Sequence, residues 1–266
     1  MTKPATILYI PHGGGPLPLL NDPGHLDLNR FLRGFPAIID KPDAIVVISA
    51  HWEETEIAIT ASASPSLLFD YYGFPPETYE YQYPAAGYPQ LAERVHKLLR
   101  AAGIEARLDT ERGFDHGLFV PLTLMYPEAD IPCLQISLSA SLDAGLHVSI
   151  GKALAALKND NLLVLGSGFS FHNIQALMSS RDDSIEPRNQ AFEDWLAHTC
   201  CATTLPEAER ERRLVHWQEA PHARYVHPRE EHLLPLQVCY GMGQAAARKV
   251  FQKPVAGFLS SAYQWN

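Results

Sequence analysis

The sequence predicts a single α/β domain over residues 1–266, a sandwich in which a central mixed, mostly parallel sheet is flanked by helices. Two observations predict this fold. Short apolar runs with the length of buried strands alternate along the chain with longer segments of helical periodicity. In addition, 46% of the 266 residues are hydrophobic and 19% are charged, which is enough apolar material for one sizeable core.

Five apolar runs are predicted as strands, at residues 6–10, 44–49, 131–138, 161–165 and 255–259. Four segments with apolar side chains at helical spacing are predicted as helices, at residues 89–102, 144–158, 185–203 and 233–247. Residues 64–88 differ from both, because they hold four prolines, with seven aromatic side chains between Phe69 and Tyr83. This segment is predicted as a long surface loop that its aromatic side chains keep ordered.

Composition and charge exclude several classes of partner. The net charge of −9 is spread along the chain without a Lys/Arg cluster, which argues against a nucleic-acid partner. No run approaches the roughly 20 apolar residues of a membrane helix, and the first run is shorter than a secretory signal requires. The four cysteines form no C-x-x-C pair. We therefore expect a cytoplasmic protein with reduced thiols and no membrane contact, and no pattern indicates its oligomeric state.

Three of the twelve histidines closely follow predicted strands: His12, His51 and His172. In an open α/β sheet the carboxyl ends of the strands meet at one edge, and ligand sites form there. One histidine in this position is more often a hydrogen-bonded loop residue, but three of them predict an active site at this edge. The glycines after His12 match neither phosphate-binding motif, so a phosphate loop is not favoured.

Two further polar segments carry histidines. Asp115-His116 lies in a turn between apolar stretches, where the aspartate can orient an imidazole. The segment from His222 to His232 packs histidines and carboxylates in front of a predicted helix, although a charged helix start has the same composition. Imidazole and carboxylate together suit non-haem iron, and imidazole also suits zinc. The remaining histidines are expected at the surface: His25, His96, His147, His198 and His216.

The histidine motifs stand in an order that resembles a known family. They are Pro11-His12-Gly13, Ser49-Ala50-His51-Trp52, Phe114-Asp115-His116-Gly117, Phe171-His172-Asn173 and Pro228-x-x-Glu231-His232-x-x-Pro235-Leu236. This order is similar to that of the class III (LigB-type) extradiol ring-cleavage dioxygenases, in particular the DOPA 4,5-dioxygenase-like branch of bacteria and plants. The resemblance extends from His12 past Leu236 and covers nearly the whole chain.

The resemblance implies one divalent metal ion and a set of ligands for it. His12, His51 and His232 match the metal ligands of this branch, whereas the wider class has a glutamate in the third place. Glu230 or Glu231 therefore stays an alternative third ligand. Fe(II) is the metal implied for activity. Zn(II) is the alternative, because three imidazoles on one ion are also a zinc arrangement.

The resemblance also implies a reaction. His172 matches the acid–base histidine of the family, and His116 matches a second active-site histidine that hydrogen-bonds substrate or oxygen. A catechol must lose protons to chelate a metal ion, and histidine titrates near neutral pH. The chain is therefore expected to insert O2 into a catechol and to open the ring to a muconic semialdehyde.

The expected substrate is a para-substituted catechol, such as DOPA or a phenylpropanoid acid. Arg224, Tyr225, His222 and His227 precede the third ligand and are candidates for binding its substituent, for instance a carboxylate. A solvated loop would have the same composition. Two other functions stay open: a zinc hydrolase that uses the same histidines, and a non-catalytic relative that binds metal or a phenolic ligand. The chain has no H-E-x-x-H, which weighs against the first, and all five motif histidines, which weigh against the second.

Overall fold

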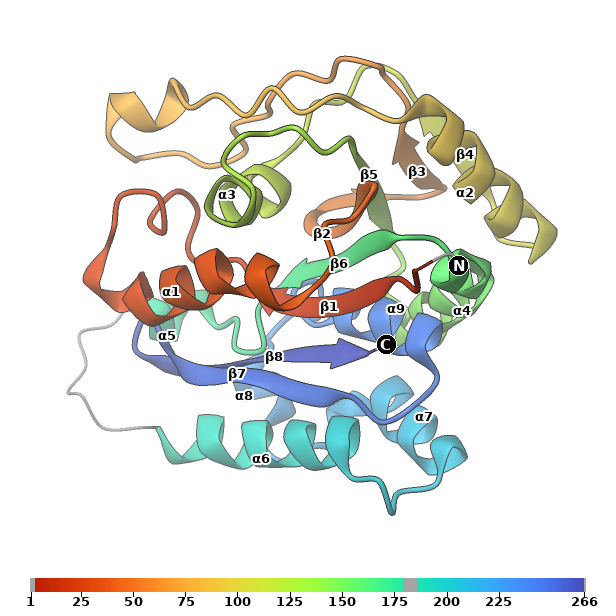
Figure 1. Ribbon diagram of the computed structural model, residues 1–266. Coiled ribbons are helices and arrows are strands. Elements are labelled where there is room, and N and C mark those ends of the chain that lie inside the picture. The colour runs from red at the N-terminus through yellow and green to blue at the C-terminus, as the bar shows by residue number, and fades with distance from the viewer. Residues whose placement is uncertain (1–2, 179–185, 266) are drawn as a thin grey trace.

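A mixed eight-stranded sheet forms the centre of the molecule, and helices cover both of its faces (Figure 1). The computed structural model describes residues 3–178 and 186–265. In chain order the strands are β1 (Thr6–Pro11), β2 (Ala44–Glu54), β3 (Ile57–Thr60), β4 (Ala106–Asp109), β5 (Cys133–Ser139), β6 (Leu162–Gly168), β7 (Arg248–Val255) and β8 (Phe258–Trp265). Their order in the sheet is β4-β3-β5-β2-β6-β1-β8-β7.

The neighbouring strands β5, β2, β6 and β1 run parallel, as do β3 and β4 at one side. Antiparallel pairing occurs where β3 meets β5 and along the flank formed by β1, β8 and β7. The predicted mixed, mostly parallel sheet between helices is therefore confirmed. Because β1, β6 and β2 are direct neighbours, their carboxyl ends lie side by side at one edge of the sheet.

The α-helices connect the strands on both sides of the sheet. They are α1 (Leu26–Gly34), α2 (Pro89–Ala101), α3 (His116–Met125), α4 (Ala144–Leu154), α5 (Ile174–Leu177), α6 (Pro187–Cys201), α7 (Glu207–Val215), α8 (Ala223–Val226) and α9 (Leu234–Gly243). Short 3₁₀ helices cover Pro23–His25, Phe35–Ile38, Pro76–Tyr79, Ala155–Asn159 and Trp217–Glu219. Within the described residues, no helix has the length and apolar character needed to cross a bilayer.

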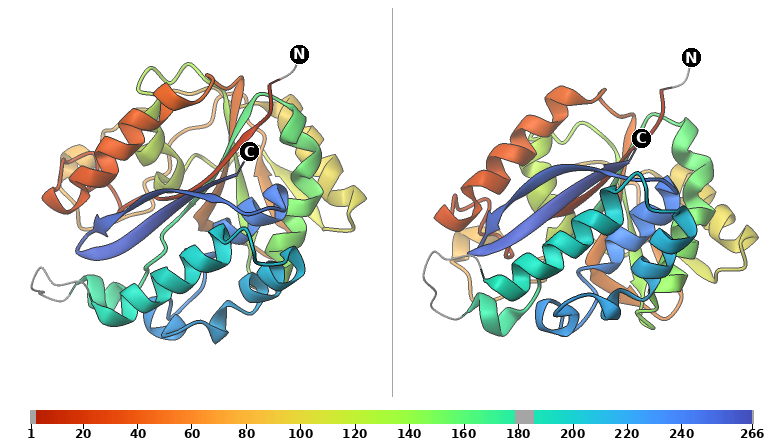
Figure 2. Two further views of the ribbon diagram at one scale, coloured as in Figure 1. Left: turned by 60° about the horizontal axis from the view of Figure 1, so that its bottom comes forward. Right: turned by 90° about the horizontal axis from the view of Figure 1, so that it is seen from below.

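Side chains of the central strands alternate between two apolar cores, as the period of two of a strand requires. In β1, Ile7 and Tyr9 belong to the core that includes α2, α4 and α9, whereas Leu8 and Ile10 belong to the core that includes α1 and α3. Figure 2 shows α6 lying along β7 and β8, where it extends the first core. Burial on both faces explains why these strands appear in the sequence as continuous apolar runs.

The strand predicted at residues 255–259 is wrong. That apolar run contains the turn between β7 and β8, where Ala256 and Gly257 have φ values of 50° and 84°. The run therefore belongs to two strands of one hairpin. The helices predicted at residues 89–102, 144–158 and 233–247 correspond to α2, α4 and α9. The helix predicted from residue 185, which itself lies outside the described residues, corresponds to α6.

Two histidines expected at the surface, His25 and His147, are instead fully buried. The Nε2 of His147 accepts a hydrogen bond from the backbone N–H of Ser139 at 3.2 Å, and its Nδ1 donates to the carbonyl of Asp143 at 2.6 Å. The Nε2 of His25 likewise accepts from the backbone N–H of Gly14 at 3.1 Å. Burial lowers the pKa of both imidazoles. They are neutral side chains that hold loops in place.

The four cysteines are free thiols. Cys133, Cys200 and Cys239 are buried, and burial raises the pKa of Cys133 and Cys239 to about 12. Burial also raises the pKa of Cys200, and that of the half-buried Cys201. All four side chains are therefore protonated at neutral pH.

The crossing of α4 and α9 depends on two glycines. A Cβ added at Gly151 would lie 2.1 Å from the carbonyl oxygen of Val238, and one added at Gly241 would lie 2.1 Å from that of Val148. We expect Gly151→Ala to lower the free energy of unfolding by roughly 1–3 kcal/mol or more, because the helices must move apart. Chemical denaturation measures this loss.

Gly34, at the end of α1, is the matched control. It has helical φ and ψ of −84° and −24°, and nothing lies within 4 Å of an added Cβ. Gly34→Ala should therefore raise the free energy of unfolding by about 0.5–1 kcal/mol. Equal stabilities of Gly151→Ala and Gly34→Ala would contradict the close helix crossing.

Acid should destabilise the protein through its buried histidines. The pKa of His147 is lower in the folded protein than in the unfolded chain, because burial disfavours the charged ring. Its contribution to stability is complete above about pH 6.5 and is lost as the pH falls toward the lowered folded pKa, by up to about 1.4 kcal/mol per pH unit. Denaturation above and below that pH should show a smaller acid-induced loss for His147→Gln than for the unchanged protein. His216→Gln, at an exposed histidine, is the control. An unaltered acid response of His147→Gln would contradict this prediction.

Candidate metal centre and active site

His12 follows β1 and is buried at the edge formed by the strand ends. Its backbone N–H donates to the carbonyl of Gly168 at 3.0 Å, which joins it to the end of β6. Its Nδ1 lies 3.0 Å from the hydroxyl of Ser167, and this hydroxyl donates its own proton to the carbonyl of Gly117 at 2.5 Å. Ser167 therefore accepts from His12, so Nδ1 of His12 carries the proton and Nε2 presents a lone pair.

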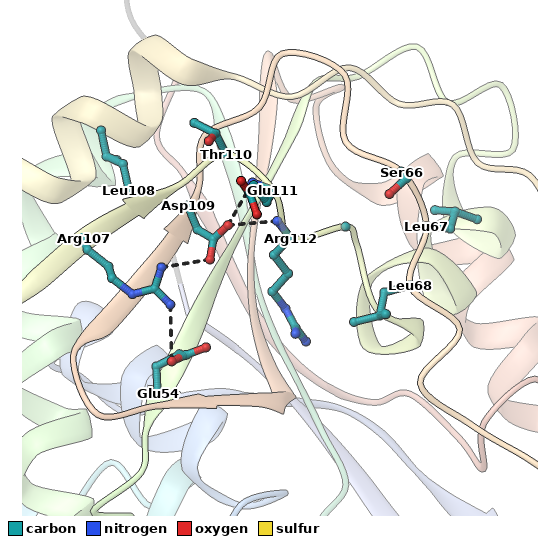
Figure 3. Close-up of a pocket in the computed structure, with 11 residues that line it drawn as sticks. Glu54, Ser66, Leu67, Leu68, Arg107, Leu108, Asp109, Thr110, Glu111 and Arg112 are labelled. Atoms are coloured by element: carbon teal, nitrogen blue, oxygen red, sulfur yellow. Dashed lines mark hydrogen bonds and ion pairs between the residues drawn. The ribbon is translucent and has the colours of Figure 1, made fainter.

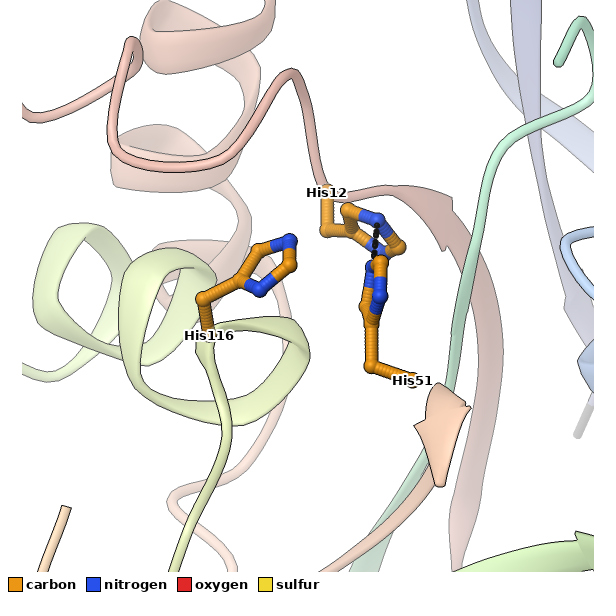
Figure 4. Close-up of side chains that lie close together, drawn as sticks. All are labelled: His12, His51 and His116. Carbon is orange, nitrogen blue, oxygen red and sulfur yellow. Dashed lines mark hydrogen bonds between the residues drawn. The ribbon is translucent and has the colours of Figure 1, made fainter. Parts of the chain in front are cut away.

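His51 and His232 bring two more ring nitrogens to the same place. His51 lies inside β2 rather than after it, because β2 continues to Glu54 through an irregularity in its pairing with β5. Figure 4 shows the Nε2 atoms of His12 and His51 facing each other, 2.9 Å apart. The Nε2 of His232, which precedes α9, lies 3.3 Å from that of His51. Nδ1 of His232 donates to Glu231 Oε1 at 2.9 Å, so its Nε2 also presents a lone pair.

Three converging ring nitrogens fit a divalent metal ion. Imidazole nitrogens at about 2.1 Å from a tetrahedral ion lie about 3.4 Å from one another. The two Nε2–Nε2 distances of 2.9 and 3.3 Å are close to that spacing. Burial, followed by the charges of neighbouring histidines, lowers the pKa of all three rings well below the usual value. They are therefore neutral at neutral pH, which is the form that binds metal.

His172 stands beside these three nitrogens. Its ring stacks on that of His232, with centroids 3.3 Å apart and planes 17° from parallel. Its Nδ1 lies 3.0 Å from Glu231 Oε1, the same oxygen that accepts from His232. Burial alone would raise the pKa of Glu231, but the hydrogen bond from His172 and nearby positive charge outweigh it and lower the pKa. Glu231 is therefore an ionised carboxylate that accepts from Nδ1 of His172, so Nε2 is the nitrogen of that ring that does not face Glu231.

His116 is the first residue of α3. Its position is set by Asp115, the N-cap residue, whose buried carboxylate accepts from the N–H of Gly117 at 3.0 Å. The ring centroids of His116 and His51 are 3.9 Å apart. In Figure 4 the ring of His116 points toward His12 and His51.

Asp70 is a site residue that the sequence pattern did not identify. It lies in the loop of residues 64–88, and its Oδ1 accepts from the backbone N–H of His116 at 3.1 Å and from Nδ1 of the same residue at 2.7 Å. Its Oδ2 lies 3.8 Å from Nδ1 of His51. Burial alone would raise the pKa of Asp70, but the hydrogen bond from His116 lowers it. A single carboxylate within an aromatic run was the only available signal in the sequence.

All five motif histidines belong to one site. Within residues 3–178 and 186–265, two groups of potential ligands have their donor atoms within 4.8 Å of one another: His12, His51 and His116, and His172, Glu231 and His232. The 3.3 Å contact between His51 and His232 joins the two groups. The structure therefore brings together the residues proposed as ligands and those proposed as acid–base groups.

The four residues predicted to bind substrate lie around α8 and make other contacts. His227 is fully buried, its Nε2 donates to a backbone carbonyl at 2.9 Å, and burial lowers its pKa to about 3. Arg224 donates to the carboxylate of Glu230 at 2.6 Å. The ring of Tyr225 packs under an arginine, and His222 is exposed. In the described part of the chain, none of the four has a hydrogen bond, ion pair or ring contact with the five motif histidines.

A cavity of about 600 Å³ lies beside the histidine site (Figure 3). Residues 66–68 and 107–113 form most of its wall. Arg112 links the cavity to the site, because its guanidinium donates to the carbonyl of His51 at 3.4 Å and to the carboxylate of Asp115 at 3.2 Å. The motif histidines, all of which the structure describes, do not line this cavity. It is therefore a neighbour of the site and not the place where the ring nitrogens converge.

Comparisons with known proteins show the family to which the chain is similar. The family described as the catalytic LigB subunit of aromatic ring-opening dioxygenase matches residues 24–259. Dioxygenase tasH of Hapsidospora irregularis is 42% identical, over 89% of this chain and 78% of that protein. The protein named 4,5-DOPA dioxygenase extradiol from Escherichia coli is 34% identical, over 94% of this chain and 89% of that protein. The protein of the same name from Beta vulgaris is 39% identical, over 76% of this chain and 73% of that protein.

A solved structure shares the fold. The crystal structure of an uncharacterized protein from Escherichia coli superposes with a TM-score of 0.79 at 30% identity, and the match covers 99% of this chain and 100% of that one. The family match and the relatives both extend over most of the sequence. The predicted family relationship with class III extradiol enzymes is therefore confirmed. The chain belongs to the LigB family of aromatic ring-opening dioxygenases.

Proposed function

We propose that this chain is an extradiol dioxygenase that inserts O2 into a catechol at a non-haem divalent metal ion, held by His12, His51 and His232. The convergence of their Nε2 atoms, 2.9 and 3.3 Å apart, is the observation that supports it most. Relatives named 4,5-DOPA dioxygenase extradiol support the reaction class. In this proposal the whole chain acts as one catalytic domain with two small-molecule substrates.

Fe(II) is the proposed metal of the active enzyme. Held by the three imidazoles, a non-haem Fe(II) ion would supply open positions for a chelating substrate and O2, and the redox chemistry that joins them. Zn(II) fits the same imidazoles but lacks redox chemistry. Glu231 is the less suitable third ligand, because its Oε1 faces the Nδ1 atoms of His172 and His232. Glu230 is hydrogen-bonded to Arg224 instead.

His172 is the proposed acid–base residue. A catechol must lose protons before both of its oxygens can bind a metal ion. Glu231 holds the proton on Nδ1 of His172 at 3.0 Å, so Nε2 is the atom that accepts a proton from the catechol. The carboxylate then stabilises the imidazolium, as an orienting carboxylate does in other histidine-based sites. The same proton is available for the later ring-opening step.

The proposed substrate is a para-substituted catechol such as DOPA, and the proposed product is a muconic semialdehyde. The printed names of the relatives support a DOPA-like catechol. Binding of its substituent by Arg224, Tyr225, His222 and His227 stays a prediction. A substrate carboxylate would compete with Glu230 for the guanidinium of Arg224.

Exchange of the metal tests the proposed function. We expect the protein stripped of metal and reloaded anaerobically with Fe(II) to consume O2 with para-substituted catechols and to form a yellow ring-opened product. The Zn(II)-loaded protein should hold its metal without consuming O2, since zinc has no redox chemistry. An oxygen electrode and a panel of catechols measure both. No uptake with any catechol, despite bound metal, would contradict the dioxygenase and favour a zinc hydrolase or a ligand-binding relative.

Substitutions should separate metal binding from proton transfer. His172→Gln keeps a donor for Glu231 and should retain the metal, while kcat falls about 100- to 10,000-fold through loss of acid–base catalysis. His232→Gln removes a proposed ligand and should lose metal on dialysis. Metal content and initial rates of oxygen uptake give the two readouts. Full activity of His172→Gln, or full metal retention by His232→Gln, would contradict the assigned roles.

A further inference from the structure

Two carboxylates link the histidines of the site in pairs. Glu231 uses one oxygen to accept from the proposed ligand His232 at 2.9 Å and from the proposed acid–base residue His172 at 3.0 Å. Asp70 lies 2.7 Å from Nδ1 of His116 but 3.8 Å from Nδ1 of the proposed ligand His51. The contacts of Glu231 are thus nearly equal, whereas those of Asp70 favour one histidine.

We propose that Asp70 is a positioning residue that turns the lone pair of His116 toward the bound catechol, and that it acts through His116 rather than through the proposed metal ligand His51. This inference rests on the proposed function, because His116 can contact a catechol only if the chain binds one. Among the described residues of the site, His116 and His172 are the non-ligand imidazoles that have a carboxylate partner.

The contact of Asp70 with His116 is a hydrogen bond, and its contact with His51 is not. A distance of 2.7 Å is typical of a charge-assisted N–H···O bond. A distance of 3.8 Å is longer than a hydrogen bond. The Oδ1 of Asp70 also accepts from the backbone N–H of His116 at 3.1 Å, so it holds the ring and the start of α3 together. Asp70 therefore acts on His116 directly and on His51 only through its charge.

The hydrogen bond decides which nitrogen of His116 carries the proton. An ionised carboxylate only accepts, so Nδ1 is the donor and Nε2 keeps its lone pair in the neutral ring. A ring nitrogen of His116 lies within 4.8 Å of those of His12 and His51, and the ring faces these two side chains (Figure 4). Nε2 of His116 can therefore accept a hydrogen bond from a hydroxyl of a catechol that binds beside it.

The aromatic loop of residues 64–88 holds Asp70 in position. Tyr71 packs on the ring of His116 with centroids 5.7 Å apart, and its hydroxyl donates to the carbonyl of Thr78 at 2.5 Å. Only 17% of the Asp70 side chain is exposed. Because these contacts of Tyr71 do not involve the Asp70 carboxylate, we expect Asp70→Asn to keep the loop and the fold.

Asp70→Asn and Glu231→Gln form a matched pair of tests, because each removes one charge at constant size. We expect Asp70→Asn to bind Zn(II) as tightly as the unchanged protein, in competition with a chromophoric chelator. Its kcat with Fe(II) should fall about 10- to 100-fold, the usual cost of losing an orienting partner, with KM nearly unchanged. Glu231→Gln, whose carboxylate contacts a proposed ligand directly, should lose both zinc affinity and kcat.

A double substitution tests whether Asp70 acts through His116. The combined variant Asp70→Asn/His116→Gln should be no slower than His116→Gln alone, because residues that act as a unit have non-additive effects. Asp70→Glu, which keeps a carboxylate, should recover part of the rate. Zinc affinity that falls in Asp70→Asn as far as in Glu231→Gln, or rate losses that multiply in the double variant, would overturn the proposal.

Nitrogen-15 spectra of histidine-labelled, zinc-loaded protein give a readout without turnover. His116 should have a protonated Nδ1 in the unchanged protein and a mixture of both neutral tautomers in Asp70→Asn. An unaltered tautomer in Asp70→Asn would overturn the positioning role. Failure of the unchanged Fe(II) protein to consume any catechol would overturn the proposed function and the contact of His116 with a catechol, while the spectra would still show whether Asp70 positions His116.

Discussion

Three imidazole nitrogens that face one another in a buried place impose an electrostatic constraint on the whole site. Their Nε2 atoms lie 2.9 and 3.3 Å apart, so a cation must balance lone pairs that have little access to water. Each ring then has to keep its proton on the outer nitrogen. Ser167 provides the outer partner for His12, and Glu231 provides it for His232. The positions of the rings, together with the outer partners of His12 and His232, determine which ring nitrogen is available to a metal ion.

Such convergence requires close backbone contact where β6 passes the segment that carries His232. A Cβ added at Gly168 would lie 2.2 Å from the carbonyl oxygen of His232. That carbonyl accepts from the N–H of Phe169 and from the hydroxyl of Tyr9, each at 2.9 Å. The missing side chain of Gly168, with one hydrogen bond from the end of β6 and one from β1, thus brings the segment before α9 to the sheet edge.

The parts of the fold that depend on local pattern were the predictable ones. Apolar runs located β1, β2, β5 and β6, and the histidines beyond three of them located the edge of the sheet that carries the site. The pattern failed at residues 255–259, where a tight turn divides one apolar run between two strands. The sequence also could not predict the hydrogen-bond partners of the histidines. Asp70 is 46 residues from His116, and Ser167 is 155 residues from His12. Contacts between such distant segments arise from packing and leave no period in the sequence.

The burial of the thiols affects how well the protein resists oxidation by side products of its own reaction. Enzymes that handle O2 at a metal ion release peroxide and superoxide when turnover fails, and these species attack thiolates far faster than thiols. Cys133, Cys200 and Cys239 are buried and protonated, so they offer neither access nor a reactive form. Among the four cysteines, oxidation would begin at the half-buried Cys201, the last residue of α6. The apolar core, whose three cysteines are both covered and protonated, is therefore spared thiol oxidation.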